Sequence, residues 1–424
     1  MATHLGPSTS SEPRASAGGP NGDARGSEPG ARFDDAMLDA LRRVGDPPAD
    51  RVIEALFADR EVAQARRLLA TLVQNDVPPP TGLPPEVLDY LRSSDAVNGA
   101  ESEALEAGQE LFAEHGPLIL MSLAHYSLPA AYAAAKGVEV LHRTAYLEKR
   151  PAKRLFETTQ MVIDVMTPGG LGRAGRGVRT AQKVRLMHAM VRYLIQHDQE
   201  HPWDDSLGVP INQEDLAGTL MTFSWITLDG LDKLGVHPSP RAKQQYLGAW
   251  RAVGRLMGLE QRLLPANLEE AEVLTRRIQA RQVAPSEAGR LLTRALLDMV
   301  ETASDTRCLR DMSSALMRHF LPSEVAEFLG VPRHALDNLL VDVVEVLADS
   351  DNDAMRELPL VGRAARSFSL HFIQWMIHVE LGGRSAPFVI ADQLRRRWRL
   401  DADSEPSFWS RLGEWLGKRF SGIL

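Results

Sequence analysis

The stretch that decides the fold runs from Arg154 to Ile195 and reads RLFETTQMVIDVMTPGGLGRAGRGVRTAQKVRLMHAMVRYLI. Apolar residues recur in its first and last parts at three- and four-residue steps, which predicts two amphipathic helices. Pro151 suits the first position of the first helix, and the residues TPGG at 167–170 end it. A turn rich in glycine and arginine then leads into the second helix. The sequence therefore predicts a helical hairpin.

Polar residues occur on the apolar sides of both predicted helices. On the first helix, Arg154 and Thr158 lie one turn apart on the side of the apolar stripe. That stripe consists of Leu155, Thr158, Thr159, Val162, Val165 and Met166. On the second helix, His188 lies within a stripe whose other members are Val184, Met187, Val191 and Ile195. Because buried polar groups need partners, we expect these polar side chains to face one interior space.

These residue types suit a haem. A neutral imidazole in an apolar pocket is a good ligand for iron, and arginines bind haem propionates through paired, charged hydrogen bonds. Arg185 and Arg192 lie one step before and after His188 on an adjoining line of the helix, so they are candidates for the propionates. The alternative is that His188 is a hydrogen-bonded histidine of an ordinary core.

Four segments resemble a known family, and they occur in the same order along the chain. They read SLPAAYAAAKGVEVLHRTAYL, RLFETTQMVIDVM, VRLMHAMVRYLI and GVPINQEDLAGTLMTFSWITLDGLDKLG. Over about residues 105–265 the sequence resembles the latex-clearing proteins and the MpaB oxygenase. The resemblance implies an all-α, globin-like core that holds haem b, with additional N- and C-terminal helices. It also implies oxidative cleavage of isoprenoid double bonds with O2.

The same resemblance assigns roles to residues of this sequence. It makes His188 the axial ligand of the iron, and Arg154 and Thr158 the arginine–threonine pair near it. The family's proposed catalytic base is a glutamate upstream, for which Glu139 is the nearest candidate. Glu157 departs from the pattern, because latex-clearing members have a lysine there. The expected substrate is therefore an isoprenoid-like or other hydrophobic small molecule rather than rubber.

Composition agrees with a large helical enzyme. The chain has 424 residues, enough to bury a cofactor-sized cavity, and 44% of them are hydrophobic while 6% are aromatic. Lys and Arg number 48 against 56 Asp and Glu, and this net charge of −8 gives no general attraction to nucleic acid. Cys308 is the single cysteine, which excludes an internal disulfide and a cysteine-held iron–sulfur cluster.

We divide the chain into four segments. Residues 1–32 are rich in Gly, Ser, Pro and Ala, and we expect this tail to be disordered. Residues 33–103 form a helical cap, 104–270 the haem-binding core, and 271–424 a C-terminal helical region packed on the core. Because the tail has neither a hydrophobic signal segment nor a twin-arginine pair, we expect a cytoplasmic protein.

Two segments of the sequence bear on membrane contact. The run from 116 to 135 has no acidic or basic side chain except His125, but Tyr126, Ser127 and Pro129 in its middle favour a buried helix in a pocket wall over a membrane span. The amphipathic segment 406–424 leaves peripheral membrane contact open as an alternative to docking on the core.

Three further motifs offer alternatives. His197, Glu200 and His201 match the HxxEH pattern of inverted zinc peptidases, which makes a zinc hydrolase one alternative, but Pro202 and Trp203 follow at once, so we expect the pair at a solvent-exposed helix end. The glycines at 170–175 spell GxGxxG, but the helical segment before them argues against a dinucleotide site. Residues 324–341 resemble a helix-turn-helix whose acidic second helix does not suit DNA. A haem- or lipid-binding protein without turnover is the remaining alternative.

Overall fold

The computed structural model describes residues 32–58, 85–92, 99–148, 151–172, 175–302, 307–333, 389–398 and 400, together with positions 366, 369, 370 and 373. Across these ranges the regular secondary structure is helical. The one extended pairing found there is an isolated antiparallel bridge between Ala134 and Val283. The predicted all-α class is confirmed.

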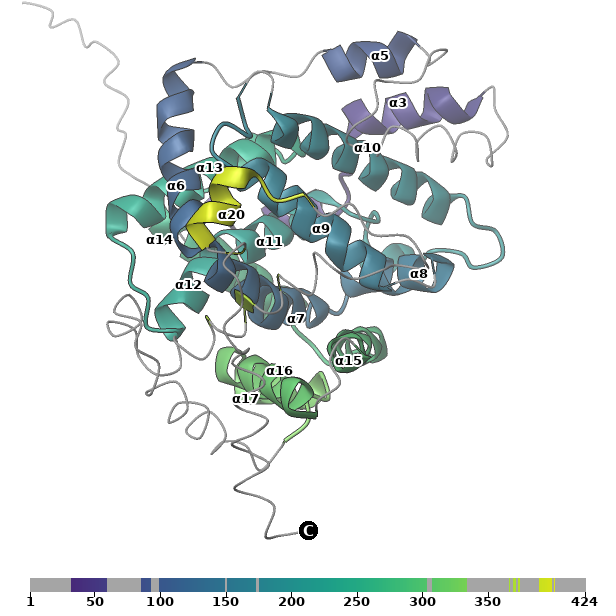
Figure 1. Ribbon diagram of the computed structural model, residues 1–424. Helices are drawn as coiled ribbons and strands as arrows, with labels where there is room; N and C mark the ends of the chain where they lie inside the picture. The colour runs from purple at the N-terminus through teal and green to yellow at the C-terminus, as the bar shows by residue number, and fades with distance from the viewer. Residues whose placement is uncertain are drawn as a thin grey trace, which may run out of the picture.

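Figure 1 shows the helices that the structure describes. In chain order they are α2 Asp35–Leu41, α3 Pro47–Ala58, α5 Pro85–Arg92, α6 Gly99–Ser122, the π-helix η1 Leu123–Ser127, α7 Leu128–Tyr132, α8 Val138–Glu148, α9 Pro151–Met166, α10 Arg176–Gln196, the short η2 Asp205–Leu207, α11 Gln213–Phe223, α12 Trp225–Lys233, α13 Pro240–Leu256, the short η3 Gln261–Leu263, α14 Leu268–Gln282, α15 Glu287–Thr302, α16 Arg307–Phe320, α17 Ser323–Phe328 and α20 Asp392–Trp398.

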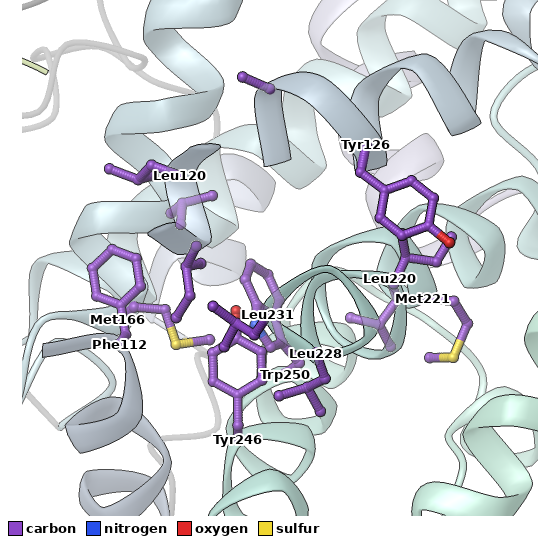
Figure 2. Close-up of a cluster of buried hydrophobic side chains, with 14 of the residues drawn as sticks. Phe112, Leu120, Tyr126, Met166, Leu220, Met221, Leu228, Leu231, Tyr246 and Trp250 are labelled. Carbon is purple, nitrogen blue, oxygen red and sulfur yellow. The ribbon is translucent and has the colours of Figure 1, made fainter. Parts of the chain in front are cut away.

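The main hydrophobic core lies between α6, α9, α11, α12 and α13. Figure 2 shows part of it, with Phe112 of α6 beside Met166 of α9, and Tyr246 and Trp250 of α13 near Leu231 of α12. The same cluster includes apolar side chains of α2, α16 and α20, so it draws on all three structured segments of the sequence-based division. The boundaries of that division stay a prediction.

A smaller hydrophobic cluster lies on the other side of α10. It joins α3 and α5 to the α10 side chains Leu186 and Ala189, which are fully buried. Arg42 connects α2 to α11 through the buried Glu214, with 3.1 Å between its Nη1 and Oε2 of the glutamate. The N-terminal helices are therefore held against the core by both apolar and charged contacts.

The predicted hairpin is formed by α9 and α10, which lie side by side (Figure 1). Helix α9 begins at Pro151 and ends at Met166, immediately before the predicted stop. In the turn that follows, Gly169 has φ of +81°, a conformation that other residues adopt at a cost. Gln109 of α6 supports the turn, because its amide donates to the carbonyl of Val165 at 2.7 Å and accepts from the N–H of Gly169 at 3.1 Å.

The apolar run around His125 is broken rather than continuous. Pro117 lies inside α6, His115 just before it has non-helical dihedral angles, and the backbone then widens into the π-helix η1. In the parts of the chain that the structure describes, no helix is long and apolar enough to span a bilayer. This agrees with the expectation that the run is buried in the core, whereas the cytoplasmic location stays a prediction.

Other sequence expectations fall outside the described residues. They concern the tail 1–31, the second helix of the suggested helix-turn-helix and the amphipathic segment 406–424.

Candidate functional site

The packing of α9 on α10 brings the predicted site residues to the same level. Gly177 at the start of α10 lies against the end of α9, since a Cβ on Gly177 would stand 2.6 Å from the Cα of Val165. His188 is eleven residues beyond Gly177, and Arg154 is eleven residues before Val165. Each helix advances about 1.5 Å per residue, so this spacing leads us to expect positions 188 and 154 at a similar level of the hairpin.

His188 lies on the side of α10 that faces the main core. Val184, one turn before it, packs against the main hydrophobic cluster, and Ile195 on the same stripe is buried. His188 itself is half-buried, as are Met187 and Val191 beside it. The predicted stripe therefore points inward, but it is less completely covered than the opposite side of α10, which packs on α3.

Arg154 and Thr158 share one side of α9, as the sequence predicts. Four residues separate them, which places them one above the other on the helix. Thr158 is half-buried, whereas the side chain of Arg154 lies outside the described part of the structure. Glu157 is also half-buried and adjoins Thr158, so α9 presents a carboxylate at the position of the family's lysine.

A second histidine, His125 of η1, lies in the interior but is already bound by protein groups. Its Nδ1 is 3.1 Å from the carbonyl oxygen of Met121, and its Nε2 is 3.1 Å from the hydroxyl of Ser313. Burial lowers the pKa of His125 to about 4, so the ring is neutral at pH 7. Because both ring nitrogens have hydrogen-bond partners, His125 is a poor candidate for a metal ligand compared with His188.

Arg185 and Arg192 are bound to carboxylates at the start of α3. Arg185 forms a two-bond ion pair with Asp46, at 2.5 Å from Nε and 2.7 Å from Nη2. Arg192 is buried, pairs with Asp50 and donates to the carbonyl of Pro210 at 2.9 Å. Burial raises the pKa of Asp50, although Arg192 opposes this effect. The expected role on haem propionates is not tested directly, but these contacts give both arginines a structural role in fastening α3 to α10.

Glu139 lies at the beginning of α8 and is partly exposed. One carboxylate oxygen is 3.4 Å from Nε of Arg143, and the other is 3.9 Å from Nδ1 of His142. Arg143 in turn donates to the carbonyls of His201 and Pro202 in the loop after α10. The structure therefore connects Glu139, through Arg143, with the loop that follows α10, and its role as a base stays a prediction.

The zinc-peptidase interpretation requires both histidines on one helix face, and this requirement is not met. Helix α10 ends at Gln196, and His197 is its C-cap residue, with Nδ1 2.7 Å from the carbonyl of Tyr193. His201 is in the following loop, where 72% of its side chain is exposed, and Asp198 binds the backbone N–H groups of Glu200 and His201. The two histidines therefore share no helix face. Within the described ranges no three His, Cys, Asp or Glu residues gather as a metal site.

The GxGxxG segment follows helix α9, not a strand, as expected for an accidental match.

Sequence reasoning missed a buried polar chain that joins α9 to its surroundings. Asp164 of α9 accepts a hydrogen bond from the hydroxyl of Thr180 on α10 at 2.8 Å and another from the amide of Gln160 at 2.9 Å. The signal in the sequence was Asp164 at a position next to the apolar stripe, where a carboxylate requires partners. Its partners come from distant positions and could not be read from spacing.

Comparison with known proteins decides the family. Residues 110–348, more than half of the chain, match the family described as ER-bound oxygenase mpaB/B'/Rubber oxygenase, catalytic domain. The chain belongs to this family. The resemblance identified in the sequence is therefore confirmed, and membership supports an oxygenase.

Two relatives extend the comparison beyond the matched domain. The rubber oxygenase of Streptomyces sp. (strain K30) is 24% identical over 344 residues, which are 78% of this chain and 83% of that protein. The structure of latex clearing protein LCP in the closed state covers 78% of this chain and 91% of its own, with a TM-score of 0.64 at 23% sequence identity. That likeness shows a shared fold.

Proposed function

We propose that this member of the oxygenase family depends on haem b and uses O2 to oxygenate or oxidatively cleave an isoprenoid-like or other hydrophobic small molecule. One observation carries the proposal. Helices α9 and α10 pack against each other from Gly177 and Val165 onward, and Val184, one turn before His188, packs against the main core, which supports His188 and the Arg154–Thr158 turn as parts of one site. These are the positions that the family resemblance associates with an iron ligand and its neighbouring pair.

The residues present fit a haem. A haem brings four of its iron ligands with it, so the protein needs to supply one suitable side chain, and His188 is an imidazole in mostly apolar surroundings. The stripe of α10 that contains His188 is partly exposed, although Val184 in this stripe packs against the main cluster. This pattern is expected where a flat apolar group covers the face of a helix. His125 does not compete, because Met121 and Ser313 occupy both of its ring nitrogens.

When bound, haem b supplies a redox-active iron that activates O2. His188 would hold the iron from α10. Thr158 can donate or accept one hydrogen bond near the reacting atoms, and Arg154 on the same side of α9 supplies a fixed positive charge. Apolar side chains of α6, α9 and α10 contribute to the main core beside this region, which suits a hydrophobic substrate.

A carboxylate is the remaining requirement if a proton leaves the substrate. Glu139 and Glu157 are the two candidates. Glu139 is paired with Arg143 and stands near the end of α10. Glu157 is nearer to Thr158 on α9. Separate replacement by glutamine distinguishes them, because the amide keeps the size of the side chain and cannot accept the proton.

Haem content of the purified protein tests the proposal. Protein from haem-sufficient cells should show a Soret band and about one haem per chain, and His188→Ala should lose most of both. His201→Ala is the matched control, because His201 is an exposed histidine in the loop after the same helix. A protein that has no haem after reconstitution, or a His188→Ala variant with a wild-type spectrum, would contradict the proposal.

Turnover requires a separate measurement. O2 consumption with a panel of short isoprenoids and other apolar alkenes should rise above the rate without substrate, and either Glu139→Gln or Glu157→Gln should lower it at unchanged haem content. Bound haem without O2 consumption on any substrate would favour the alternative of a haem-binding protein that does not turn over.

A further inference from the structure

A segment distant in sequence lies against the helices of the candidate site. We call residues 389–398, which include α20, the C-terminal strap. Its side chains Ile390, Leu394 and Trp398 are 4%, 1% and 1% exposed. Figure 1 shows α20 lying across α6, close to α9. The strap is therefore docked through a buried apolar side.

The kink of α6 provides the seat for this strap. Pro117 has no N–H, so the helical hydrogen bond that would reach the carbonyl of Ala113 is missing. The indole N–H of Trp398 donates to that carbonyl instead, at 3.0 Å. Gly116 allows the indole to approach, because any Cβ at this position would overlap the ring. The ring of Phe112 packs edge-on against it, with the centroids 5.6 Å apart.

On the side of α9, the strap is held through its backbone. The N–H of Val389 donates to Oε1 of Gln160 at 2.8 Å, and Nε2 of Gln160 donates to the carbonyl of Val389 at 3.0 Å. The oxygen and the nitrogen of the buried Gln160 amide thus both bond to the backbone of Val389, as the backbone of a neighbouring β-strand would. The same Nε2 lies 2.9 Å from Asp164, which accepts from Thr180 of α10. A continuous polar chain thus joins the strap, α9 and α10.

Gln160 lies on the side of α9 that faces away from the candidate site. Two residues separate it from Thr158, which corresponds to a rotation of about 200° around the helix. The strap therefore contacts the side of α9 away from Arg154 and Thr158, and can support their placement without touching a substrate.

We propose that Gln160 is a positioning residue: it fixes α9 to the C-terminal strap, and docking of the strap sets where the Arg154–Thr158 turn stands relative to His188. The second part rests on the proposed function, whereas the docking itself does not. Gln160 makes three hydrogen bonds, one with the buried Asp164 and two with the backbone of Val389, and replacement by leucine keeps its bulk but leaves the N–H and carbonyl of Val389 without these partners.

Docking is measured on Trp398 directly. The chain has seven tryptophans, so labelling with 5-fluorotryptophan gives separable 19F resonances, and the one lost in Trp398→Phe identifies the strap. In Gln160→Leu we expect this resonance to move toward the position of solvent-exposed fluorotryptophan. Amide hydrogen exchange of residues 389–398 and of α9 should become at least tenfold faster. Gln393→Leu is the matched control, since Gln393 is in the strap and its one hydrogen bond to a residue that the structure describes is a long contact of 3.5 Å with the carbonyl of Pro168.

A rescue distinguishes positioning from a general loss of packing. In Gln160→Glu the carboxylate faces the carbonyl of Val389 and Asp164, and both repel it at pH 8. A protonated carboxyl group donates one hydrogen bond and accepts another, so it can restore both bonds to the backbone of Val389, although not the second bond that the amide donates to Asp164. The Trp398 resonance of this variant should therefore return toward the wild-type position at pH 5, whereas that of Gln160→Leu should not change with pH.

The outcomes separate the parts of the proposal. A wild-type Trp398 resonance and wild-type exchange in Gln160→Leu would overturn it, as would a Gln160→Glu variant that behaves like Gln160→Leu at every pH. In haem-loaded protein, Gln160→Leu should change the electron paramagnetic resonance spectrum of the iron at unchanged haem content, and an unchanged spectrum would refute the effect on the site. If the wild type binds no haem, the proposed function fails while the measurements on Trp398 still decide the docking.

Discussion

Protonation of the buried His125 should destabilise the protein in mild acid, by an amount that follows from its surroundings. Burial lowers the pKa of His125 from an ordinary value of 6.5 to about 4. Between these two pH values the unfolded chain binds a proton that the folded protein does not. The free energy of unfolding therefore falls as the pH falls from 6.5 to 4, and the full difference corresponds to roughly 3 kcal/mol.

His125→Asn removes the titration and keeps part of the bonding. The asparagine amide can still donate to the carbonyl of Met121, but the hydrogen bond to Ser313 is lost, which costs about 1–3 kcal/mol at every pH. Urea unfolding should therefore show a variant that is less stable than wild type at pH 7 and that approaches or exceeds it near pH 4.5.

Comparison of the two proteins at each pH cancels the titration of the other groups. His201→Asn, which changes an exposed histidine, is the matched control for the substitution itself. If the difference between wild type and His125→Asn is the same at pH 7 and pH 4.5, the reasoning is refuted, because His125 would then titrate alike in the folded and unfolded states.

Three further predictions concern packing and buried charge. Glu214→Gln should lower the free energy of unfolding by about 3 kcal/mol, since the carboxylate is fully buried between two arginines, and a loss below about 1 kcal/mol would contradict this. A double-mutant cycle of Asp46→Ala and Arg185→Ala should give a coupling energy of about 2 kcal/mol, whereas additive effects would mean that the ion pair contributes nothing. Gly177→Ala should destabilise the protein by about 1–3 kcal/mol, because the added Cβ would overlap the backbone of α9. Gly248→Ala should stabilise it by about 0.5–1 kcal/mol, because the added Cβ would have no atom within 4 Å. Equal melting temperatures of the two variants would argue against close packing at Gly177.

Local patterns in the sequence were sufficient for the elements of the fold. Apolar periodicity and the stop at residues 167–170 predicted both helices of the hairpin, and Pro151 is the first residue of α9 as expected. His188 was predicted to face the core from the spacing of its neighbours, and Val184 of the same stripe packs against the main cluster, whereas the role of His188 stays a prediction. These features depend on residues within one or two helical turns, which a sequence displays directly.

Interactions between distant segments were not accessible in the same way. Arg185 and Arg192 were expected to bind propionates, but their carboxylate partners Asp46 and Asp50 come from a helix more than 130 residues earlier. Gln160 was not singled out, because its partner Val389 is 229 residues away and contributes only its backbone. The sequence shows which charged or amide side chains require a hydrogen-bonding partner if they are buried. Which residue becomes that partner depends on the fold.

The identity of the iron ligand is the central claim, and a crystal structure of the haem-loaded protein tests it most directly. Our account predicts continuous electron density between the iron and a ring nitrogen of His188, with the macrocycle lying between α9 and α10 on the side of Thr158. Iron bound by any other side chain, or a haem on the side of α10 that packs on α3, would contradict it.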